Sequence, residues 1–261
     1  MEGDWFVGRG EQQAPRGAKV LTFKGGDWKD PANYRPITCI PTITKMVTLA
    51  IHKRMRAWLF GRVESSILEC EQRGVRTSRG CKDAVIENMA SNTMKRMDKD
   101  EHAELYNDSK KAYENVNHAS MEELLDAYRF PLGIQSIIIS MMAQWKIHLS
   151  YGAKKDVGKM RLENGIIQGD AFSPLLFVLM IDPFIKVMKK KLGNQVEILY
   201  NMDNLKVSTS SIATAQTVHI AVKQYAQSVG MVTNTKKSAI QLSIETPLQE
   251  SLSRTYPEWT R

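Results

Sequence analysis

The spacing of apolar residues predicts several helices along the chain. From Pro41 to about Phe60, apolar side chains recur at helical spacing, which predicts one amphipathic helix with Thr42 or Thr44 as its N-cap. The apolar stripe of this helix consists of Ile43, Met46, Val47, Ala50, Ile51, Met55 and Leu59. A second helix is predicted over residues 83–97, after a loop over residues 72–80 that contains glycine and arginine.

The middle of the chain predicts two shorter helices separated by helix-breaking residues. Ser120–Glu123 has the composition of a capping box, so a helix is predicted to begin there and to run to about Tyr128. Pro131 and Gly133 then interrupt the pattern. The next helix is predicted to carry an apolar cluster, made of Ile137, Ile138, Ile139, Met141 and Met142.

Two longer helices are predicted in the second half of the chain. The first, over residues 172–190, has Pro174 in its first turn, where proline is tolerated, and Pro183 inside, where a kink is expected. The second, over residues 213–229, is expected to end at Gly230.

Alternating or short apolar runs predict the strands. Residues 102–108 alternate and then stop at polar residues, as a strand does when its last side chain enters a cleft. Short strands are also predicted over residues 147–151 and 159–162. Residues 196–202 and 205–209 predict a hairpin with a tight turn at Asp203-Asn204, because both residue types tolerate the left-handed conformation. The whole pattern predicts an α+β fold with a mainly antiparallel sheet.

Composition favours a folded chain with an anionic partner. With 261 residues and 43% apolar side chains, the chain can bury one substantial core or two small ones. The formal charge of +8 and the pI of about 9.3 favour nucleic acid, although basic surfaces also serve solubility and membrane contact. The basic run Lys189–Lys191 falls at the predicted end of a helix, where the helix dipole favours cations.

Cysteine usage and hydropathy indicate an intracellular protein. The three cysteines, Cys39, Cys70 and Cys81, are too widely spaced to suggest disulfides or a zinc site. No apolar run approaches the roughly twenty residues that span a bilayer, and no signal peptide is recognisable, so no membrane partner is expected. Nothing in the sequence points to a protein partner.

Two aspartates are candidates for metal-assisted chemistry. Asp108 ends a predicted strand, and Asp203 lies in the predicted hairpin turn. Phosphoryl transfer to a nucleotide uses two divalent ions about 4 Å apart, held by carboxylates at separate strand ends, and Mg²⁺ prefers such hard oxygen ligands. Taken alone, each aspartate has a plainer explanation, since Asp108 could simply end a strand and Asp203 could simply form a turn.

The order of the surrounding motifs resembles the reverse transcriptase domain of non-long-terminal-repeat, LINE-type retrotransposons, over roughly Leu21 to Leu242. The segment GIIQGDAFSPLLF, Gly165–Phe177, is the most specific of these motifs. The full set, in chain order, is Asn33–Ile37 with Pro41-Thr42; Glu71–Arg76 with Ser78–Asp83; Asp108–Tyr113; Gly165–Phe177; Asn201–Lys206; and Gly230-Met231 with Lys236-Lys237.

The resemblance implies the fingers and palm of a right-hand polymerase, with an antiparallel palm sheet packed on helices. The implied divisions are a flexible leader over residues 1–18, a fingers-like region over 19–100, a palm over 101–245 and a tail over 246–261. Within the palm, a helical segment at about 130–160 is expected on the fingers side. No thumb is expected in this chain.

The resemblance also implies roles for individual residues. Asp108 and Asp203 would be the catalytic metal ligands, for two Mg²⁺ ions or for Mn²⁺. Arg76 would contact the incoming triphosphate, since its planar donor suits phosphate oxygens. Tyr113 would be the steric gate that crowds a ribose 2′-hydroxyl. As plainer alternatives, Tyr113 could be ordinary core and Arg76 a solvated loop cation.

Three further residues complete the implied substrate site. Gln168 and Gly169 would line the nucleotide and template pocket, with glycine permitting close backbone approach. Lys237 would be a general acid toward the leaving pyrophosphate, although the adjacent Lys236 competes for this role and either lysine could be a surface charge. The implied partners are an RNA template, a DNA primer and dNTPs.

Four departures from the family pattern bear on activity. Asn204 replaces the second of two adjacent aspartates, and a neutral amide attracts a divalent cation less than a carboxylate does. Asn201 replaces an aromatic residue, Asn107 an apolar one, and Glu114 a shorter aspartate. Two hypotheses therefore stay open: an RNA-directed DNA polymerase, or an inactive remnant that binds RNA or an RNA–DNA hybrid. A third is a structural remnant without a nucleic-acid partner.

Overall fold

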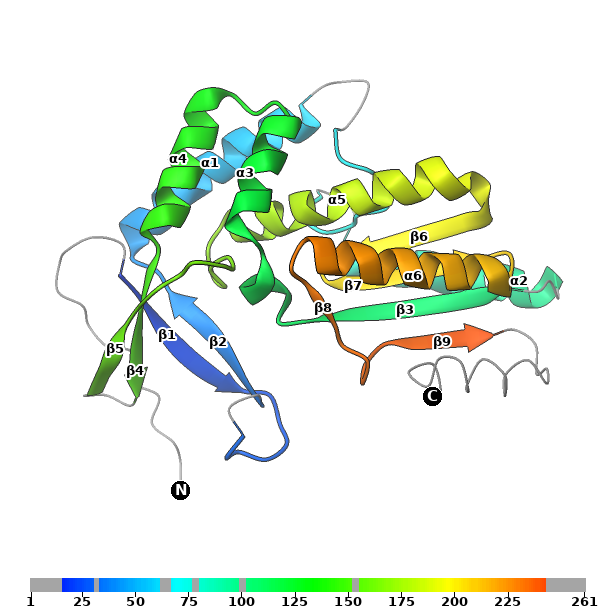
Figure 1. Cartoon of the computed structure of the whole chain (residues 1–261), viewed down its shortest axis with the longest axis horizontal. Coiled ribbons are helices and arrows are strands. Elements are labelled where there is room, and N and C mark those ends of the chain that lie inside the picture. Colours follow the sequence, from blue (N-terminus) through cyan, green and yellow to red (C-terminus); the bar gives the residue numbers. More distant parts are fainter. Residues whose placement is uncertain are drawn as a thin grey trace.

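The described chain forms two β-sheets with helices beside them (Figure 1). A computed structural model describes residues 16–30, 33–61, 67–76, 80–98, 102–151 and 155–242. One sheet has four strands in the order β2-β1-β4-β5; the other has the order β6-β7-β3-β8, with β9 also paired to β3. This arrangement is α+β with a mainly antiparallel sheet, as predicted.

The second sheet is the palm sheet, and all its strands are antiparallel to their neighbours. Its strands are β3 (Ala103–Lys110), β6 (Val196–Asn201), β7 (Asn204–Thr209), β8 (Val232–Thr233) and β9 (Ala239–Leu242). The tight hairpin between β6 and β7 confirms the predicted pair of strands. The short strands β8 and β9 were not predicted.

The palm sheet has one apolar face and one polar face. Residues directly opposite each other in paired strands share a face. On the apolar face Leu105, Ile198 and Val207 are buried beneath α5 (Ser173–Leu192) and α6 (Ile212–Ser228), which run roughly along the strands (Figure 1). The side chains that alternate with them form what we call the polar face, which includes one apolar residue, Leu199: Glu104, Tyr106, Asp108, Glu197, Leu199, Asn201, Asn204, Lys206 and Ser208.

Helix α2 (Cys81–Asp98) lies over part of the polar face and turns its own polar side toward the sheet. Asn88 and Asn92 both accept hydrogen bonds from Lys206 Nζ, and Lys95 Nζ lies 2.6 Å from Glu197 Oε2. Large apolar side chains of α2 are exposed instead, namely Val85, Ile86, Met89, Met94 and Met97.

The four-stranded sheet joins two distant parts of the chain. It combines β1 (Arg16–Phe23) and β2 (Tyr34–Cys39) with β4 (Lys146–Tyr151) and β5 (Lys155–Arg161). β1 pairs in parallel with β4, whereas the β1–β2 and β4–β5 pairs are antiparallel. The predicted strands over residues 147–151 and 159–162 are confirmed, but β1 and β2 were missed.

Helices α1 (Thr42–Phe60), α3 (His118–Ala127) and α4 (Leu132–Gln144) lie near one another, above the four-stranded sheet in the view of Figure 1. Two 3-10 turns, η2 (Ala112–Asn115) and η3 (Gly193–Gln195), complete the described elements. All the predicted helices are present, and α5 runs through Pro183 without interruption. None of the described helices is both long and apolar enough to cross a membrane.

Two predicted helix caps are wrong. Pro41 occupies the N-cap position of α1 and makes no side-chain hydrogen bond, so neither Thr42 nor Thr44 caps this helix. Helix α3 begins at His118, because the Asn117 side chain accepts a hydrogen bond from the Ser120 N–H at 3.1 Å. Asparagine satisfies an orphan donor as well as serine does, so the helix starts before the predicted capping box.

Only part of the predicted apolar stripe of α1 is buried. Ile51, Met55 and Leu59 belong to the core, whereas Ile43 and Met46 are 77% and 67% exposed. The helix is therefore amphipathic as predicted, but its first turns do not contribute to the core of the described chain.

The predicted domain boundaries stay a prediction. β1 begins at Arg16, inside the region expected to be a flexible leader. The first 15 residues and the predicted tail over residues 246–261 lie outside the described residues.

Asp182 of α5 connects three segments of the chain. Its side chain is fully buried, accepts hydrogen bonds from the Tyr128 hydroxyl and the Glu69 N–H, and lies 2.7 Å from Lys186 Nζ. A buried carboxylate is stable only when its oxygens are paired in this way. Asp182 therefore fixes the loop around Glu69 against α3 and α5.

Replacement of Asp182 tests this connection. Asp182→Ala is expected to lower the free energy of unfolding by about 3–5 kcal/mol, since it breaks a buried ion pair and leaves its partners unpaired. Chemical denaturation provides the measurement. The matched control is Asp126→Ala, an exposed aspartate of α3, which is expected to change stability by less than about 0.5 kcal/mol. Equal effects of the two changes would contradict this role for Asp182.

Candidate active site

Asp108 lies on the polar face near the end of β3, and the segment between β8 and β9 holds it in place. Asn234 Nδ2 donates to Asp108 Oδ2 at 2.8 Å, and the Asn234 N–H donates to the Asp108 carbonyl at 2.8 Å. The Asp108 N–H donates to Ser238 Oγ at 3.1 Å. The carboxylate is thus held at a fixed position, with Asn234 orienting one of its oxygens.

Asp203 lies in the two-residue turn between β6 and β7. Asn201 pairs with Asn204 across the hairpin, and Asn204 in turn pairs with Asp108. Because these pairings are consecutive, the turn that carries Asp203 lies beside the end of β3. Asn204 Nδ2 is 3.4 Å from Asp203 Oδ1, so the amide that replaces the expected carboxylate contacts the remaining one.

The conformation of this turn corrects the sequence analysis. Met202 adopts the left-handed conformation, with φ of 57°, whereas Asn204 is the first residue of β7. The turn is therefore Met202-Asp203, one residue earlier than predicted. Asn201 pairs with Asn204 and closes the hairpin, so the chain reverses at the two residues between them, Met202 and Asp203.

Tyr113 lies within electrostatic range of Asp203. Its ring stacks on Phe177 of α5, with ring centroids 5.2 Å apart and an interplanar angle of 11°. Burial, and after it the negative charge of Asp203, raises the pKa of the Tyr113 hydroxyl to about 12. The structure therefore brings Asp108, Asp203 and Tyr113 to one end of the palm sheet.

Gln168 and Gly169 belong to a segment that joins the palm to the four-stranded sheet. The Gln168 carbonyl accepts a hydrogen bond from the Thr38 N–H of β2 at 2.9 Å. Gly169 has φ of 103°, and a Cβ atom there would lie 2.8 Å from the Thr38 carbonyl oxygen. At the other end of the segment, the Ile166 N–H donates to the Tyr113 carbonyl at 2.7 Å.

Arg76 makes hydrogen bonds within its own loop. Its Nε donates to the Gln72 carbonyl at 2.9 Å, and its Nη2 donates to the carbonyls of Leu68 and Glu69 at 2.9 and 2.7 Å. Its guanidinium also lies over the Phe60 ring, 5.2 Å from the centroid. The predicted contact between Arg76 and a triphosphate stays a prediction.

Lys237 is exposed in the turn before β9, where its N–H donates to the Asn234 carbonyl at 3.0 Å. It thus follows closely on the residue that holds Asp108. Its predicted role as a general acid is likewise not tested by this arrangement.

Asp108 and Asp203 are suitable ligands for a Mg²⁺ ion whose coordination shell is completed by substrate. Among the described residues, no group of three or more His, Cys, Asp or Glu side chains is placed to hold a metal. Mg²⁺ sites in nucleotide-processing enzymes often use only one or two carboxylates, with phosphates and waters as the remaining ligands. The pair therefore supplies suitable hard oxygen donors, and Asn204 marks where a further carboxylate charge is missing.

Asn234 and Ser238 are site residues that the sequence analysis missed. Both lie in a short polar stretch whose composition is typical of any turn. Only the pairing of β8 and β9 with β3 brings this stretch to Asp108.

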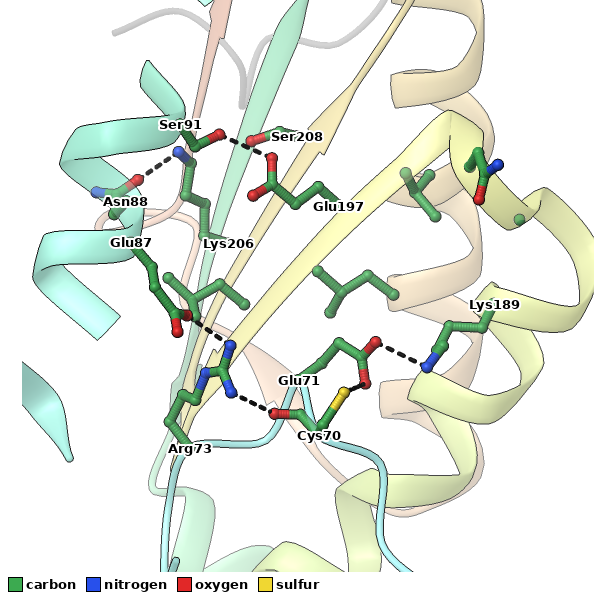
Figure 2. A pocket seen from close by; sticks show the side chains of 15 residues that line it. Cys70, Glu71, Arg73, Glu87, Asn88, Ser91, Lys189, Glu197, Lys206 and Ser208 are labelled. Atoms are coloured by element: carbon green, nitrogen blue, oxygen red, sulfur yellow. Dashed lines mark hydrogen bonds and ion pairs between the residues drawn. The ribbon is translucent and has the colours of Figure 1, made fainter. Parts of the chain in front are cut away.

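A separate cavity of about 640 Å³ lies between α2, β6 and the loop around Cys70 (Figure 2). Its charged side chains are paired with one another or with charged neighbours just outside the cavity. Arg73 lies 2.5 Å from Glu87, and Lys189 lies 2.8 Å from Glu71. Lys206 lies 2.7 Å from Glu104. Because these charges are mutually neutralised and the catalytic candidates are not among the lining residues, this cavity is a poor candidate for the reaction site.

The acidic pair at adjacent strand ends, the antiparallel palm sheet on two helices and the second sheet together define a right-hand polymerase. The profile of one family, described as reverse transcriptase (RNA-dependent DNA polymerase), matches residues 24–256. The chain therefore belongs to the reverse transcriptase family.

Curated relatives identify the branch of the family. The chain is 24% identical over 262 aligned residues to a retrovirus-related Pol polyprotein from the type-1 retrotransposable element R2 of Popillia japonica, covering 95% of this chain and 35% of that protein. It is 27% identical over 171 residues to the Pol polyprotein of the type-2 element R2DM of Drosophila melanogaster, covering 64% of this chain and 15% of that protein. The resemblance to non-LTR retrotransposon reverse transcriptase domains is confirmed, and the chain spans about a third or less of these relatives.

Solved structures of telomerase share the fold. Apo telomerase from Candida tropicalis, truncated from its C-terminal domain, matches with a TM-score of 0.66 and 15% identity, over 92% of this chain and 52% of that one. Telomerase from Candida albicans in complex with the TWJ fragment of telomeric RNA matches with a TM-score of 0.59 and 11% identity, over 90% and 42% of the two chains. At these identities the likeness supports the fold alone.

Replacement of Gly169 tests the close approach between the palm and β2. Gly169→Ala is expected to lower the free energy of unfolding by more than about 1 kcal/mol, because φ is positive and the new Cβ would overlap the Thr38 carbonyl. Urea denaturation gives the measurement. Gly133→Ala is the matched control, since a Cβ there meets nothing within 4 Å and alanine favours the helix. If both variants were equally stable, the close approach would not constrain the segment.

Proposed function

We propose that this chain is an RNA-directed DNA polymerase domain in which Asp108 and Asp203 hold divalent metal ions for nucleotidyl transfer. The observation that carries the proposal is the pairing of Asp108 with Asn204, which puts both carboxylates at the same end of the palm sheet. The family generally uses divalent metal ions. The partners would be an RNA template, a DNA primer and dNTPs, inside the cell.

The proposed roles follow from the contacts of each residue. Bound Mg²⁺ or Mn²⁺ would supply charge stabilisation for the attacking 3′-oxygen and the departing pyrophosphate. Asp108, oriented by Asn234, and Asp203 in its turn would hold the ions. The Tyr113 ring, fixed by its stack on Phe177, would form the wall that excludes a ribose 2′-hydroxyl.

The remaining substrate contacts lie around this centre. Gln168 and Gly169 would form the floor of the template and nucleotide pocket, where the backbone already approaches β2 closely. Arg76 would reach a triphosphate only by giving up its hydrogen bonds to loop carbonyls and donating to phosphate oxygens instead. Lys237 would donate a proton to pyrophosphate from the flexible end of its exposed side chain.

Asn204 is expected to weaken the metal site in two ways. It lacks the negative charge that would attract a second cation. Its amide also donates toward Asp203 Oδ1 and competes with a metal for that oxygen. We therefore expect weak activity from the unchanged chain and stronger activity once the carboxylate is restored.

Primer extension on an RNA template with Mg²⁺ or Mn²⁺ tests the proposal. Asn204→Asp is expected to increase extension by at least about ten-fold, the scale on which the surroundings of a metal change its binding or activity. Asp108→Ala in either background is expected to abolish extension. The matched control Asn194→Asp adds the same charge at an exposed site outside the palm hairpin and is expected to leave extension unchanged.

The rival function is binding without chemistry, and the observation that favours it is again Asn204. Absence of extension from both the unchanged chain and Asn204→Asp, with both folded, would argue for this rival. The fold-related telomerase of Candida albicans was solved with an RNA fragment, which is in keeping with a nucleic-acid role for the shared fold.

Salt dependence distinguishes binding from a remnant without a partner. Affinity for an RNA–DNA hybrid is expected to fall more than about ten-fold between about 50 and about 200 mM salt, through counterion release from several phosphates. Fluorescence anisotropy at several salt concentrations gives the slope. A weak and flat response would contradict both the polymerase and the binding hypotheses.

A further inference from the structure

The loop around Gln72 forms an additional edge of the palm sheet next to the turn that carries Asp203. The Tyr200 N–H of β6 donates to the Glu71 carbonyl at 2.9 Å, and the Arg73 N–H donates to the Tyr200 carbonyl at 2.7 Å. Gln72 itself forms a parallel bridge with Tyr200. The loop is therefore fixed to β6 by backbone hydrogen bonds, two residues before Met202.

Within this loop the Gln72 side chain is buried, with 1% of its surface exposed, and reaches the hairpin turn. Its Oε1 accepts hydrogen bonds from the Gly74 N–H at 2.8 Å and from the Met202 N–H at 3.2 Å. Two converging donors require an oxygen at this position, which determines the orientation of the amide. Its Nε2 has no hydrogen-bond partner among the described residues, so the carboxamide is held through its oxygen.

Met202 is the strained residue of the turn, and this loop contacts both its backbone and its side chain. It has a left-handed φ of 57°, a conformation unfavourable for a residue with a Cβ. Its N–H is bound by Gln72, and its Sδ packs so closely on Gly74 that a Cβ there would lie 2.5 Å away. The loop thus contacts both the backbone and the side chain of the residue that precedes Asp203.

We propose that Gln72 is a positioning residue for Asp203: its carboxamide oxygen holds the Met202-Asp203 turn so that the Asp203 carboxylate remains beside Asp108. This inference rests on the proposed function, since it assigns Gln72 to the same metal site. Gln72 contacts no reacting atom and acts only through the turn. Because Arg76 Nε donates to the Gln72 carbonyl, the same short loop connects the candidate triphosphate contact to the candidate metal ligand.

The alternative is that Gln72 only fills space in the core. Gln72→Leu tests this, because it preserves approximate volume and removes the acceptor. Gln72→Glu keeps an acceptor, and it loses no hydrogen bond at Nε2 within the described structure. The matched control is Gln135→Leu, which removes another buried glutamine. Gln135 lies in helix α4, and its Nε2 donates to the Phe130 carbonyl.

The readouts are the methyl resonance of Met202 in methionine-labelled protein, its broadening by Mn²⁺, and primer extension in the Asn204→Asp background. Met202→Leu assigns the resonance. In Gln72→Leu we expect the resonance to shift, the Mn²⁺ concentration for half-maximal broadening to rise 10–100-fold, and extension to fall by a similar factor. Gln72→Glu and Gln135→Leu are expected to keep the unshifted resonance.

Each result decides the inference separately from the proposed function. An unshifted Met202 resonance in Gln72→Leu overturns it, as does a shifted resonance with unchanged Mn²⁺ broadening, or an absence of broadening in the Asn204→Asp background. Absence of extension from every variant refutes the polymerase proposal, while the Met202 shift and loss of Mn²⁺ response still support the positioning role. If Gln72→Leu does not fold, hydrogen exchange of the Met202 amide is measured in the unchanged chain and in Gln72→Glu. Fast exchange in the unchanged chain overturns the inference. Slow exchange in both proteins supports it.

Discussion

The register between β3 and β7 determines where the two candidate metal ligands lie. Asp108 stands opposite Asn204, Tyr106 opposite Lys206 and Glu104 opposite Ser208, so that polar side chains share one face. The intervening Leu105 and Val207 are buried on the other face under α5 and α6. A shift of one residue would move Asp108 into the core and Leu105 toward solvent, which is a large energetic cost. Hydrophobic burial on one side thus aligns the carboxylates on the other.

Much of this arrangement could be predicted from sequence, because it depends on local periodicity. The helices, the strand that ends near Asp108 and the β6–β7 hairpin all follow from spacing, and the ordered motifs identified Asp108, Asp203 and Tyr113 as neighbours. The structure brings these three residues together. The burial of α5 likewise follows from its nearly continuous apolar sequence.

What could not be predicted depends on contacts between distant parts of the chain. β1 pairs with β4 across more than a hundred residues, and β2 contains Pro36, which weakens a strand prediction although proline is tolerated at a sheet edge. Met202 takes the left-handed position in place of Asp203 or Asn204, because the closing pair of the hairpin and the Gln72 loop decide the conformation. Tertiary contacts overrule the intrinsic preference of the turn residues here.

Helix α2 differs from the other helices in what holds it to the sheet. Asn88, Asn92 and Lys95 face the strands and bind charged groups, while Met89 and Met94 face outward. A helix attached through polar contacts exposes little new apolar surface when it separates, so its detachment should carry a small heat-capacity change compared with unfolding of the α5 core. Opening of the polar face is therefore expected to be a sub-global transition whose free energy varies almost linearly with temperature, without the curvature that unfolding of the apolar core produces.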